Sequence, residues 1–516
     1  MALLVSNAGR FFARGLLALL AACASAGVWA EADPPGRVGR LAEVSGGEAW
    51  LYTPDGGEWI RAERNRPLTT GDRLSTDAAA RAEIQIGSTT VRLDGGSELE
   101  VLQIDDERMR LQLHGGSAAV RLANAESAGE FRLVTEEGEF QTHRAGRYRF
   151  DREDGTTHAT VYIGEVLYEG PFSAQTLYGG QRGEFWLDRG IAQYSIVEPR
   201  HDEFASWNEA RDGAHERSAA TRYVSPEMTG VEDLDHHGRW EQHAEYGPLW
   251  IPHAVPVGWA PYSVGHWAWV SPWGWTWVDA APWGFAPFHY GRWVHHRNVW
   301  GWAPGRYVRR PVYAPALVAW IGGPNFSVSI SSGHMGPAGG WFPLAPHVIY
   351  VPGYRVSSRY VRYLNRGHVD RIDNIDLIVG NPGQAVSRYE YVNRRHHHAV
   401  TVVPREALHE RRPVGEFRHH GRSWRERGGE QPMLIPAPSR GGRPGAVRGA
   451  HPRGERAHVP PSPVRGAVVN ERRGFAPEQR VRRDGGRRFE SSPHPGSASP
   501  PHVTAPPQVA APARME

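Results

Sequence analysis

The tryptophans are the residues whose number and spacing most suggest a binding chemistry, because twelve of the 20 in this 516-residue chain lie between Trp240 and Trp302. Side chains two residues apart on a strand point to the same face, so rings at that spacing form rows. Such rows can stack on the apolar faces of sugars, while each indole N–H donates one hydrogen bond. The candidate aromatic platform comprises Trp267, Trp269, Trp273, Trp275, Trp277, Trp293 and Trp300.

The same rings have an alternative role as the core of a small repeat domain. Gly258-Trp-Ala-Pro-Tyr262 and Trp267 recur as Gly284-Phe-Ala-Pro-Phe288 and Trp293, at a constant offset of 26 residues. Each copy is predicted to be a β-hairpin or small meander whose apolar face is covered by its neighbours. The Gly-x-Ala-Pro steps and Pro272 are expected to mark turns, because proline cannot donate to a strand ladder. The core role is favoured for most of the rings, and glycan stacking is left for any that are exposed.

The residues needed for several kinds of catalysis do not occur in the sequence. All 59 basic residues are arginine, so chemistry that depends on lysine, such as a Walker-type phosphate loop or a Schiff base, is excluded. No Gly-x-Ser-x-Gly or His-Glu-x-x-His motif occurs, and we expect no catalytic residue and no cofactor. Adjacent histidines such as His295 and His296 point to opposite faces of a strand, so we expect no metal site. The acidic runs at 105–107 and 136–139 are interpreted as solvated hairpin tips.

Short alternating runs predict the elements of the N-terminal part of the chain. Apolar and polar residues alternate from Ala82 to Ile86 and from Met109 to Leu113, and Gly-, Asp- and Ser-rich steps end the runs. This pattern is typical of half-buried antiparallel strands joined by tight turns. We therefore predict an all-β domain over residues 37–198.

Three further segments complete the predicted organisation. Residues 199–235 are expected to form a linker with one short helix that starts at Asp202. Residues 236–404 form the predicted Trp-rich β-hairpin repeat domain. Residues 405–516 carry 21 Arg against 11 Asp and Glu, and their Arg-, Pro- and Gly-rich composition predicts a disordered tail. The predicted fold class is mainly β, with two antiparallel β domains, a short linking helix and a disordered C-terminal tail.

Residues 1–30 predict a secretory signal peptide. Arg10 and Arg14 precede a short apolar run, which ends in small residues before Ala30, the expected cleavage site. The run is shorter than the roughly 20 residues that a membrane-spanning helix needs, and we expect no transmembrane span. Cys23, the only cysteine, fits a lipoprotein cleavage site as the alternative. We expect a periplasmic or secreted protein, which argues against nucleic acid as a partner.

Motifs in the predicted N-terminal domain resemble those of FecR-type periplasmic domains. The resemblance covers about residues 38–170, and its motifs are Leu68-Thr-Thr-Gly-Asp72, Val91-Arg-Leu-Asp-Gly-Gly-Ser97, Leu113-His-Gly-Gly-Ser-Ala-Ala-Val120, Phe131-Arg-Leu-Val-Thr135 and Tyr162-Ile-Gly-Glu-Val166. Fuller members of that family relay a signal from an outer-membrane receptor to a sigma factor through a cytoplasmic segment and one membrane span. We expect neither segment here, so the resemblance implies the fold and a binding role.

The tryptophan-rich region resembles an uncharacterised Trp-rich domain family that follows FecR-like domains in exported proteobacterial proteins. The resemblance covers about residues 220–404 and includes Arg222-Tyr-Val-Ser-Pro-Glu-Met-Thr-Gly230 and Pro311-Val-Tyr-Ala-Pro-Ala-Leu317. It implies an architecture and no activity. The leading hypothesis is a non-catalytic exported envelope protein, a binding or scaffolding module that contacts cell-envelope polysaccharide or an envelope protein. The alternative is a FecR-type signalling or regulatory module that binds a partner protein.

Overall fold

The computed structural model describes residues 33–215, 218–322, 327–329, 335–396, 398–417, 433–435 and 437–438. The expected signal peptide, with Cys23 and Ala30, lies outside the described residues, as does most of the expected tail. The described chain is mainly β, with antiparallel sheets and a few short helices, as the sequence predicts.

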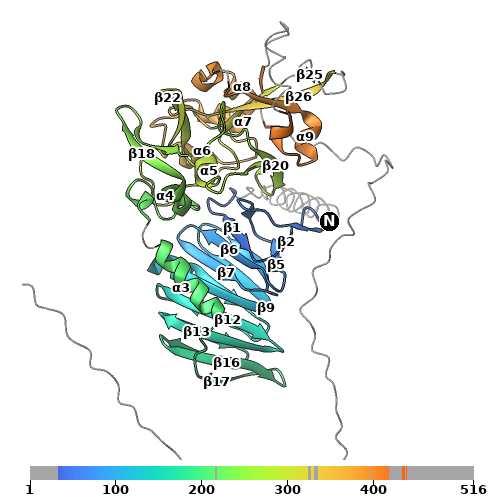
Figure 1. Cartoon of the computed structure of the whole chain (residues 1–516), viewed down its shortest axis with the longest axis vertical. Coiled ribbons are helices and arrows are strands. Elements are labelled where there is room, and N and C mark those ends of the chain that lie inside the picture. Colours follow the sequence, from blue (N-terminus) through green and yellow to red (C-terminus); the bar gives the residue numbers. More distant parts are fainter. Residues whose placement is uncertain are drawn as a thin grey trace, which may run out of the picture. The chain divides into compact units, whose positions relative to one another are not determined.

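The N-terminal region is a β-sandwich. Its elements are β1 (Gly39–Ser45), β2 (Ala49–Tyr52), β3 (Trp59–Arg61), β4 (Pro67–Leu68), β5 (Arg73–Thr76), β6 (Arg81–Ile86), β7 (Thr89–Leu93), β8 (Glu98–Ile104), β9 (Met109–Leu122), α2 (Ala125–Glu130), β10 (Phe131–Val134), β11 (Glu139–Thr142), β12 (Gly146–Glu153), β13 (Thr156–Ile163), β14 (Glu165–Gly170), β15 (Ser173–Tyr178), β16 (Gln181–Asp188) and β17 (Ile191–Val197). One sheet has the order β4-β1-β6-β7-β9-β12-β13-β16-β17, and the other has the order β3-β2-β5-β8-β9-β10-β11-β14-β15. From β10 onward the chain places two strands in one sheet and the next two in the other, which gives the stack of strands in Figure 1.

Strand β9 belongs to both sheets. Its first half, from Met109, pairs with β8 and in parallel with β10, and its second half, to Leu122, pairs with β7 and β12. The change of sheet falls at Gly116, where φ is +82° and a Cβ would lie 2.5 Å from the Cα of Ser97. Glycine alone tolerates so close an approach at positive φ without strain. The Gly-Gly step at this point therefore lets one strand serve two sheets.

The apolar positions that alternate in the sequence meet between the two sheets. Ile84 and Val91 are at most 2% exposed, as the pattern predicts. Strands β6 and β7 differ from the expected half-buried strands, because their outward-facing residues are buried as well. Glu83 lies under the helix that follows the sandwich, and Gln85 accepts a hydrogen bond from Arg40. The outer face of these strands is thus covered by later parts of the chain.

One acidic run does not fit the expected solvated turn. Glu137 is 2% exposed and accepts hydrogen bonds from Arg152 at 3.1 Å and from Thr157 at 2.7 Å, whereas Glu136 stays exposed. Asp105 does lie in a turn, where it accepts from two backbone N–H groups that follow it. Charge alone did not distinguish the buried carboxylate from its exposed neighbours.

Helix α3 (Glu203–His215) lies across the outer face of the sheet that contains β6, β7, β9 and β12 (Figure 1). Asp202 caps it, because its Oδ1 accepts from the backbone N–H of Ala205 at 2.9 Å, and this confirms the predicted start. The helix extends past Asp212, whose carboxylate is buried and pairs with Arg92 at 2.7 Å. The docked face thus combines apolar Phe204 with a buried carboxylate, which an apolar pattern cannot reveal.

The second region is built of short antiparallel strands in its described part. Its strands are β18 (Gly238–His243), β19 (Gly247–Pro252), β20 (Gly265–Val270), β21 (Gly274–Asp279), β22 (Arg292–His296), β23 (Val299–Ala303), β24 (Val318–Gly322), β25 (Ser327–Ser329), β26 (Met335–Pro343), β27 (Thr401–Pro404) and β28 (Met433–Ile435). The hairpins β18–β19 and β22–β23 share one sheet, the hairpin β20–β21 forms its own, and β24 pairs with β26 in a third. Pro272 lies in the β20–β21 turn, as expected. The predicted hairpins are present, but they do not share a single sheet.

Several helices of the second region were not predicted. The helices are α4 (Leu234–His237), α5 (Ala286–His289), α6 (Ser358–Asn365), α7 (Ile375–Gly380), α8 (Pro382–Val386) and α9 (Arg405–His409), with single 3₁₀ turns η1 (Ala220–Arg222), η2 (Val231–Asp233), η3 (Val392–Arg395) and η4 (Val414–Phe417). Helix α6 begins after Ser357, whose hydroxyl accepts from the backbone N–H of Tyr360. Its buried residues, which include Val361 and Leu364, span little more than two turns. So short a pattern does not separate a helix from a loop.

Candidate functional site

Directly opposed tryptophans join the strands of the three hairpins and of the β24–β26 pair in the second region. The cross-strand pairs are Trp240–Trp250, Trp267–Trp277, Trp269–Trp275, Trp293–Trp302 and Trp320–Trp341. Opposed side chains of an antiparallel pair share a face and lie within contact distance. The rings of Trp267 and Trp277 meet edge to face with centroids 5.4 Å apart, and the Trp341 ring lies 5.1 Å from that of Trp267. The indoles of different hairpins thus form one cluster.

Four of the buried indoles also satisfy backbone carbonyl groups in the segments between hairpins. The Nε1 atoms of Trp250, Trp293, Trp302 and Trp341 donate to the carbonyl oxygens of Leu234, Pro287, Tyr290 and Tyr262, respectively, at 2.9, 2.9, 2.8 and 2.9 Å. A buried carbonyl left without a partner costs roughly 1–3 kcal/mol, and an aliphatic side chain has no donor to offer. Tryptophan therefore both fills the core and holds its loops.

The residues of the candidate aromatic platform lie in this core. Their exposed fractions are 1% for Trp267, 4% for Trp273, 8% for Trp275, 0% for Trp277, 1% for Trp293 and 6% for Trp300, and Trp269 is partly buried. A ring must be open on one face to stack on a sugar. The structure brings these residues together, but as packed rings with covered faces, which agrees with the core role.

The two Gly-x-Ala-Pro steps at Gly258 and Gly284 and a third one, Gly301-Trp-Ala-Pro304, adopt different local structures. The first is a turn, the second leads into α5, and the third, at Gly301, lies within β23. The third step departs from the expected turn because Trp302 stands opposite Trp293 and places the step in the ladder. Equivalent positions of the first two copies touch, since the Tyr262 hydroxyl donates to the Phe288 carbonyl at 2.7 Å. The copies therefore pack through side chains.

A buried polar joint connects the sandwich to the second region. We define the joint as Arg40 and Asn65 from the sandwich with Asp233 and the Asp279–Ala281 backbone from the second region. The Arg40 guanidinium is 0% exposed, forms an ion pair with Asp233 and donates to Asn65 Oδ1 at 2.8 Å. Asn65 Nδ2 in turn donates to the Asp279 carbonyl at 2.9 Å and to the Ala281 carbonyl at 2.7 Å. One carboxylate and a chain of amide groups thus compensate a buried cation.

Asp279 contributes a fully buried carboxyl group beside the joint. Its Oδ2 accepts from Trp277 Nε1 and its Oδ1 from the backbone N–H of Ala281, each at 2.9 Å. Burial raises the pKa of Asp279 to about 7, because loss of solvent disfavours the carboxylate more than these two hydrogen bonds favour it. The folded state therefore holds a proton here that a solvated aspartate would release near pH 4.

The far edge of the sandwich leaves its inner face uncovered. Tyr194 stands opposite buried Phe185 in the β16–β17 register and so shares its inward face, as do Leu187 and Ile196. Yet Leu187, Tyr194 and Ile196 are 40, 44 and 50% exposed. Phe172, in the adjacent β14–β15 turn, is 93% exposed. Among the described strands, β17 pairs with β16 alone. We call this surface of Phe172, Leu187, Tyr194 and Ile196 the open end.

Sequence reasoning did not single out the open end. The alternation of Ala192, Tyr194 and Ile196 indicates the apolar face of a strand, and Ala192 is buried as that pattern implies. The same pattern would arise if another strand followed and covered the face. Only the sheet order shows that β17 lies at the edge.

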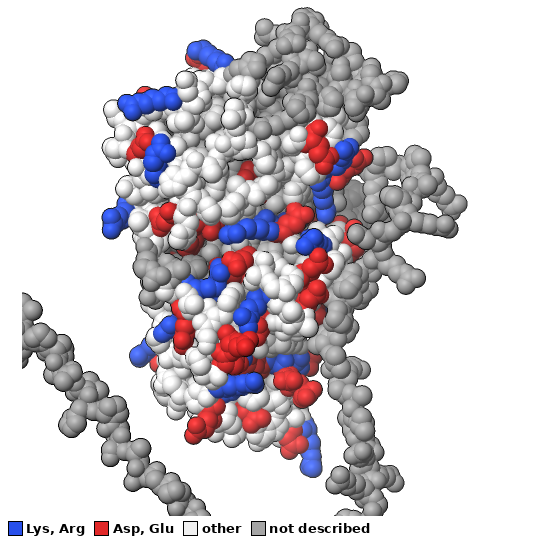
Figure 2. Space-filling model, viewed as in Figure 1, with Lys and Arg blue, Asp and Glu red and all other residues white. Residues whose placement is uncertain are grey.

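The rest of the described surface carries neither a single-sign charge patch in the view of Figure 2 nor a metal-ligand cluster. On the face in Figure 2, acidic and basic side chains are interspersed over the sandwich strands. Within the described ranges, no three His, Cys, Asp or Glu side chains converge as a metal site would require. No helix among the described residues is both long enough and apolar enough to cross a membrane.

The two regions of this β protein match two family models. The FecR protein model matches residues 72–167, and the model of a family of unknown function, DUF6600, matches residues 231–348. The chain therefore contains a FecR domain within the sandwich and a DUF6600 domain in the tryptophan-rich region.

Solved structures resemble the chain more distantly. Two crystal structures of a candidate anti-sigma factor from Parabacteroides distasonis are similar to it at 14% and 13% identity, each with a TM-score of 0.23. The matches cover 26% and 35% of this chain, and 64% and 99% of the crystallised chains. No curated protein matches the chain.

Proposed function

We propose that the chain is an exported, non-catalytic regulatory module whose sandwich, which contains the FecR domain, binds a partner protein at the open end. The observation that carries the proposal is the inner face of β16 and β17, where Tyr194 and Ile196 are about half exposed although their neighbours form the core. Soluble proteins rarely leave a contiguous apolar face uncovered unless it is an interaction site. The FecR match supports a role in partner binding rather than in catalysis.

The open end is suited to a partner that contributes a β-strand. An edge strand offers a row of backbone N–H and C=O groups that an incoming strand can pair with. A segment of alternating apolar residues that pairs along β17 (Ile191–Val197) would place its side chains over Tyr194 and Ile196. The partner would thereby complete the core that the described chain leaves open.

The two domains would then have different tasks. The DUF6600 domain contacts the sandwich through the joint around Arg40, on the side of β1 and β6, while β17 lies at the other edge of the same sheet. The DUF6600 domain therefore contacts one side of this sheet, and the β17 edge at the other side is available to a partner. The predicted signal peptide at 1–30 would place that partner in the periplasm or outside the cell.

Site-specific photocrosslinking in the native host tests the proposal. A photoreactive phenylalanine at Phe172 or Tyr194 should give a discrete adduct with one envelope protein, identified by mass spectrometry. The matched control is the same group at Val257, which is fully exposed on the DUF6600 domain. Adducts at Val257 as strong as those at Tyr194, or none at either open-end position, would refute the proposed site.

Substitutions at the open end separate partner binding from folding. Ile196→Ser should abolish the Tyr194 adduct and leave the thermal unfolding midpoint nearly unchanged. Sedimentation with purified sacculi tests an envelope glycan as the partner instead. If the parent and the Ile196→Ser variant are retained on sacculi to the same extent, the result would favour a glycan partner over a protein partner.

A further inference from the structure

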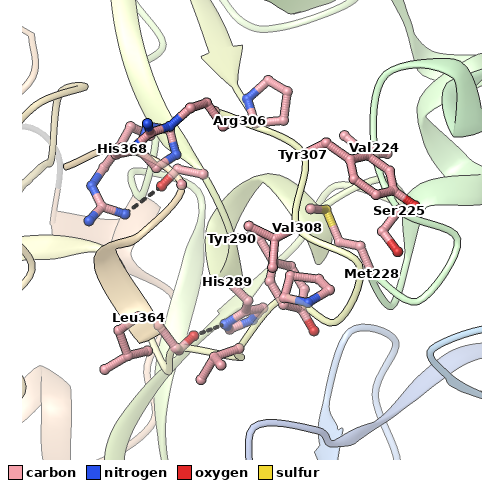
Figure 3. A pocket seen from close by; sticks show the side chains of 18 of the residues that line it. Val224, Ser225, Met228, His289, Tyr290, Arg306, Tyr307, Val308, Leu364 and His368 are labelled. Carbon is pink, nitrogen blue, oxygen red and sulfur yellow. Dashed lines mark hydrogen bonds between the residues drawn. The ribbon is translucent and has the colours of Figure 1, made fainter. Parts of the chain in front are cut away.

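A pocket in the DUF6600 domain lies outside the proposed partner surface. Its walls come from the η1–η2 segment, α5, the loop after β23 and α6. Figure 3 shows His289, Tyr290 and Leu364 among its walls, with Arg306, Tyr307 and His368 around them. Tyr307 is 64% exposed, whereas Tyr290 is 5% exposed. The pocket thus runs from an aromatic mouth to a buried wall.

Arg292, one of the residues that line this pocket, is a buried cation at 1% exposure. Its guanidinium donates to the carbonyl oxygens of Gly291 at 2.8 Å and Val348 at 3.3 Å, and to Asn365 Oδ1 at 2.9 Å. These partners are neutral, and no described carboxylate forms an ion pair with it. A guanidinium held out of water with only dipoles around it is costly, since its lost hydration is only partly replaced.

Three other buried arginines of the chain have carboxylate partners, whereas Arg66, at 6% exposure, has no ion pair among the described residues. Arg40 pairs with Asp233, Arg92 pairs with Glu83 at 2.8 Å and with a second carboxylate, and Arg149 pairs with two aspartates. The chain therefore compensates these cations with carboxylates of its own. Arg292 lacks such a carboxylate, and unlike Arg66 it lies at the wall of this pocket.

The rest of the pocket also lacks negative charge. None of the described residues that line it is acidic. Burial lowers the pKa of His368 well below its ordinary value, and the nearby charge of Arg292 lowers it further, so His368 is neutral at physiological pH. The apolar part of the walls includes Met228, Leu317 and Leu364, each at most 9% exposed. The lining thus combines one buried cation with apolar and aromatic surface.

We propose that this pocket binds a small monocarboxylate, with the carboxylate group against Arg292 and the apolar body against Tyr290 and Leu364. A planar guanidinium matches the two oxygens of a carboxylate, and the ligand would provide the opposite charge that Arg292 lacks. A phosphate is less suited, because a dianion calls for several convergent donors or cations, and the pocket's other arginine, Arg306, is exposed and already paired with Asp370. The ligand class follows from this balance of charge.

Calorimetric titration of the full mature chain tests the site, with benzoate and butyrate as probes and their neutral amides, benzamide and butyramide, as controls. The acids should bind with a Kd in roughly the millimolar range, as their few atoms allow, and at least tenfold more tightly than the amides. Equal binding of acid and amide, or no binding of either acid, would overturn the proposal.

Substitutions test whether benzoate binds at Arg292, and a variant at the mouth of the pocket covers the case in which Arg292→Gln does not fold. Arg292→Gln should weaken benzoate binding at least tenfold, whereas Arg309→Gln, an exposed arginine outside the pocket, should not change it. If Arg292→Gln fails to fold, Tyr307→Ala at the mouth serves instead, with a several-fold loss of benzoate affinity and an unchanged unfolding midpoint. Unchanged benzoate affinity in the Tyr307→Ala variant, or in an Arg292→Gln variant that folds, would place the binding site elsewhere.

Discussion

The FecR and DUF6600 domains solve the problem of building a β core in different ways. The FecR sandwich stacks long ladders whose aliphatic residues, such as Ile84 and Leu111, fill the space between two sheets. The DUF6600 domain has short strand pairs in separate sheets, and opposed indoles such as Trp293 and Trp302 fill its core. Long ladders satisfy their backbone within the sheet. Short hairpins leave buried loops, whose carbonyls need a donor from the core itself.

The comparison explains why the four rings that donate to loop carbonyls are tryptophan and not leucine or phenylalanine. Indole offers the largest apolar area of any side chain together with one N–H donor. Trp302 uses both, since its ring is fully buried and its Nε1 donates to the Tyr290 carbonyl. A row of closely spaced tryptophans is therefore not by itself a sign of sugar binding.

The largest effect is expected from removing one of these rings. Trp302→Ala should lower the free energy of unfolding by about 3–5 kcal/mol, because it leaves a cavity and an unpaired carbonyl. Trp302→Phe keeps most of the ring and should cost roughly 1–3 kcal/mol for the lost hydrogen bond. Urea unfolding of both variants measures the difference. Equal stability of Trp302→Phe and the parent would show that the indole N–H contributes nothing.

The joint between the two domains should be nearly as sensitive. Arg40→Met leaves Asp233 without its buried partner and should cost about 3 kcal/mol. Calorimetry should then resolve two unfolding transitions where the parent shows one, because the domains lose their coupling. The control is Arg64→Met, since Arg64 reaches the same carboxylate from a position 39% exposed and should matter little. A single unshifted transition for Arg40→Met would mean that the joint does not couple the domains.

Stability should depend on pH through Asp279. Its folded pKa of about 7 lies above the ordinary 3.8, so the folded state binds the proton more tightly than the unfolded chain does. Its contribution is fully present at low pH and is lost as pH rises from about 4 to about 7. Asp279→Asn cannot titrate, so the parent should lose more stability than this variant over that interval. Urea midpoints across the interval measure the difference, and parallel pH profiles would contradict the assignment.

The smallest effect on folding is expected at the open end. Tyr194→Ser and Ile196→Ser should change the free energy of unfolding by less than about 1 kcal/mol, because both side chains are about half exposed. The control is Phe185→Ser, opposite Tyr194 and fully buried, which should be severely destabilising. A large loss of stability at Ile196 would indicate that the described chain itself covers this face.

Much of the fold could be predicted from the sequence, for identifiable reasons. Alternation revealed β6 to β9, and Asp202 marked the start of α3, because both are local patterns. The pairing of Arg40 with Asp233 joins residues far apart in sequence, so no local pattern contains it. The exposure of Tyr194 depends on sheet order in the same way. The Trp267 set was recognised as a row of rings, but its burial follows from how the hairpins pack together.

Hydroxyl-radical footprinting of the mature full-length chain, read out by mass spectrometry, tests the central contrast between a closed indole core and an open sandwich edge. Phe172 and Tyr194 should be oxidised rapidly, while Trp267, Trp277 and Trp302 should be protected until the protein unfolds. Oxidation of these tryptophans in the folded protein as fast as Tyr194 would contradict the account, because it would mean that the rings are exposed to solvent and the open end is not distinctive.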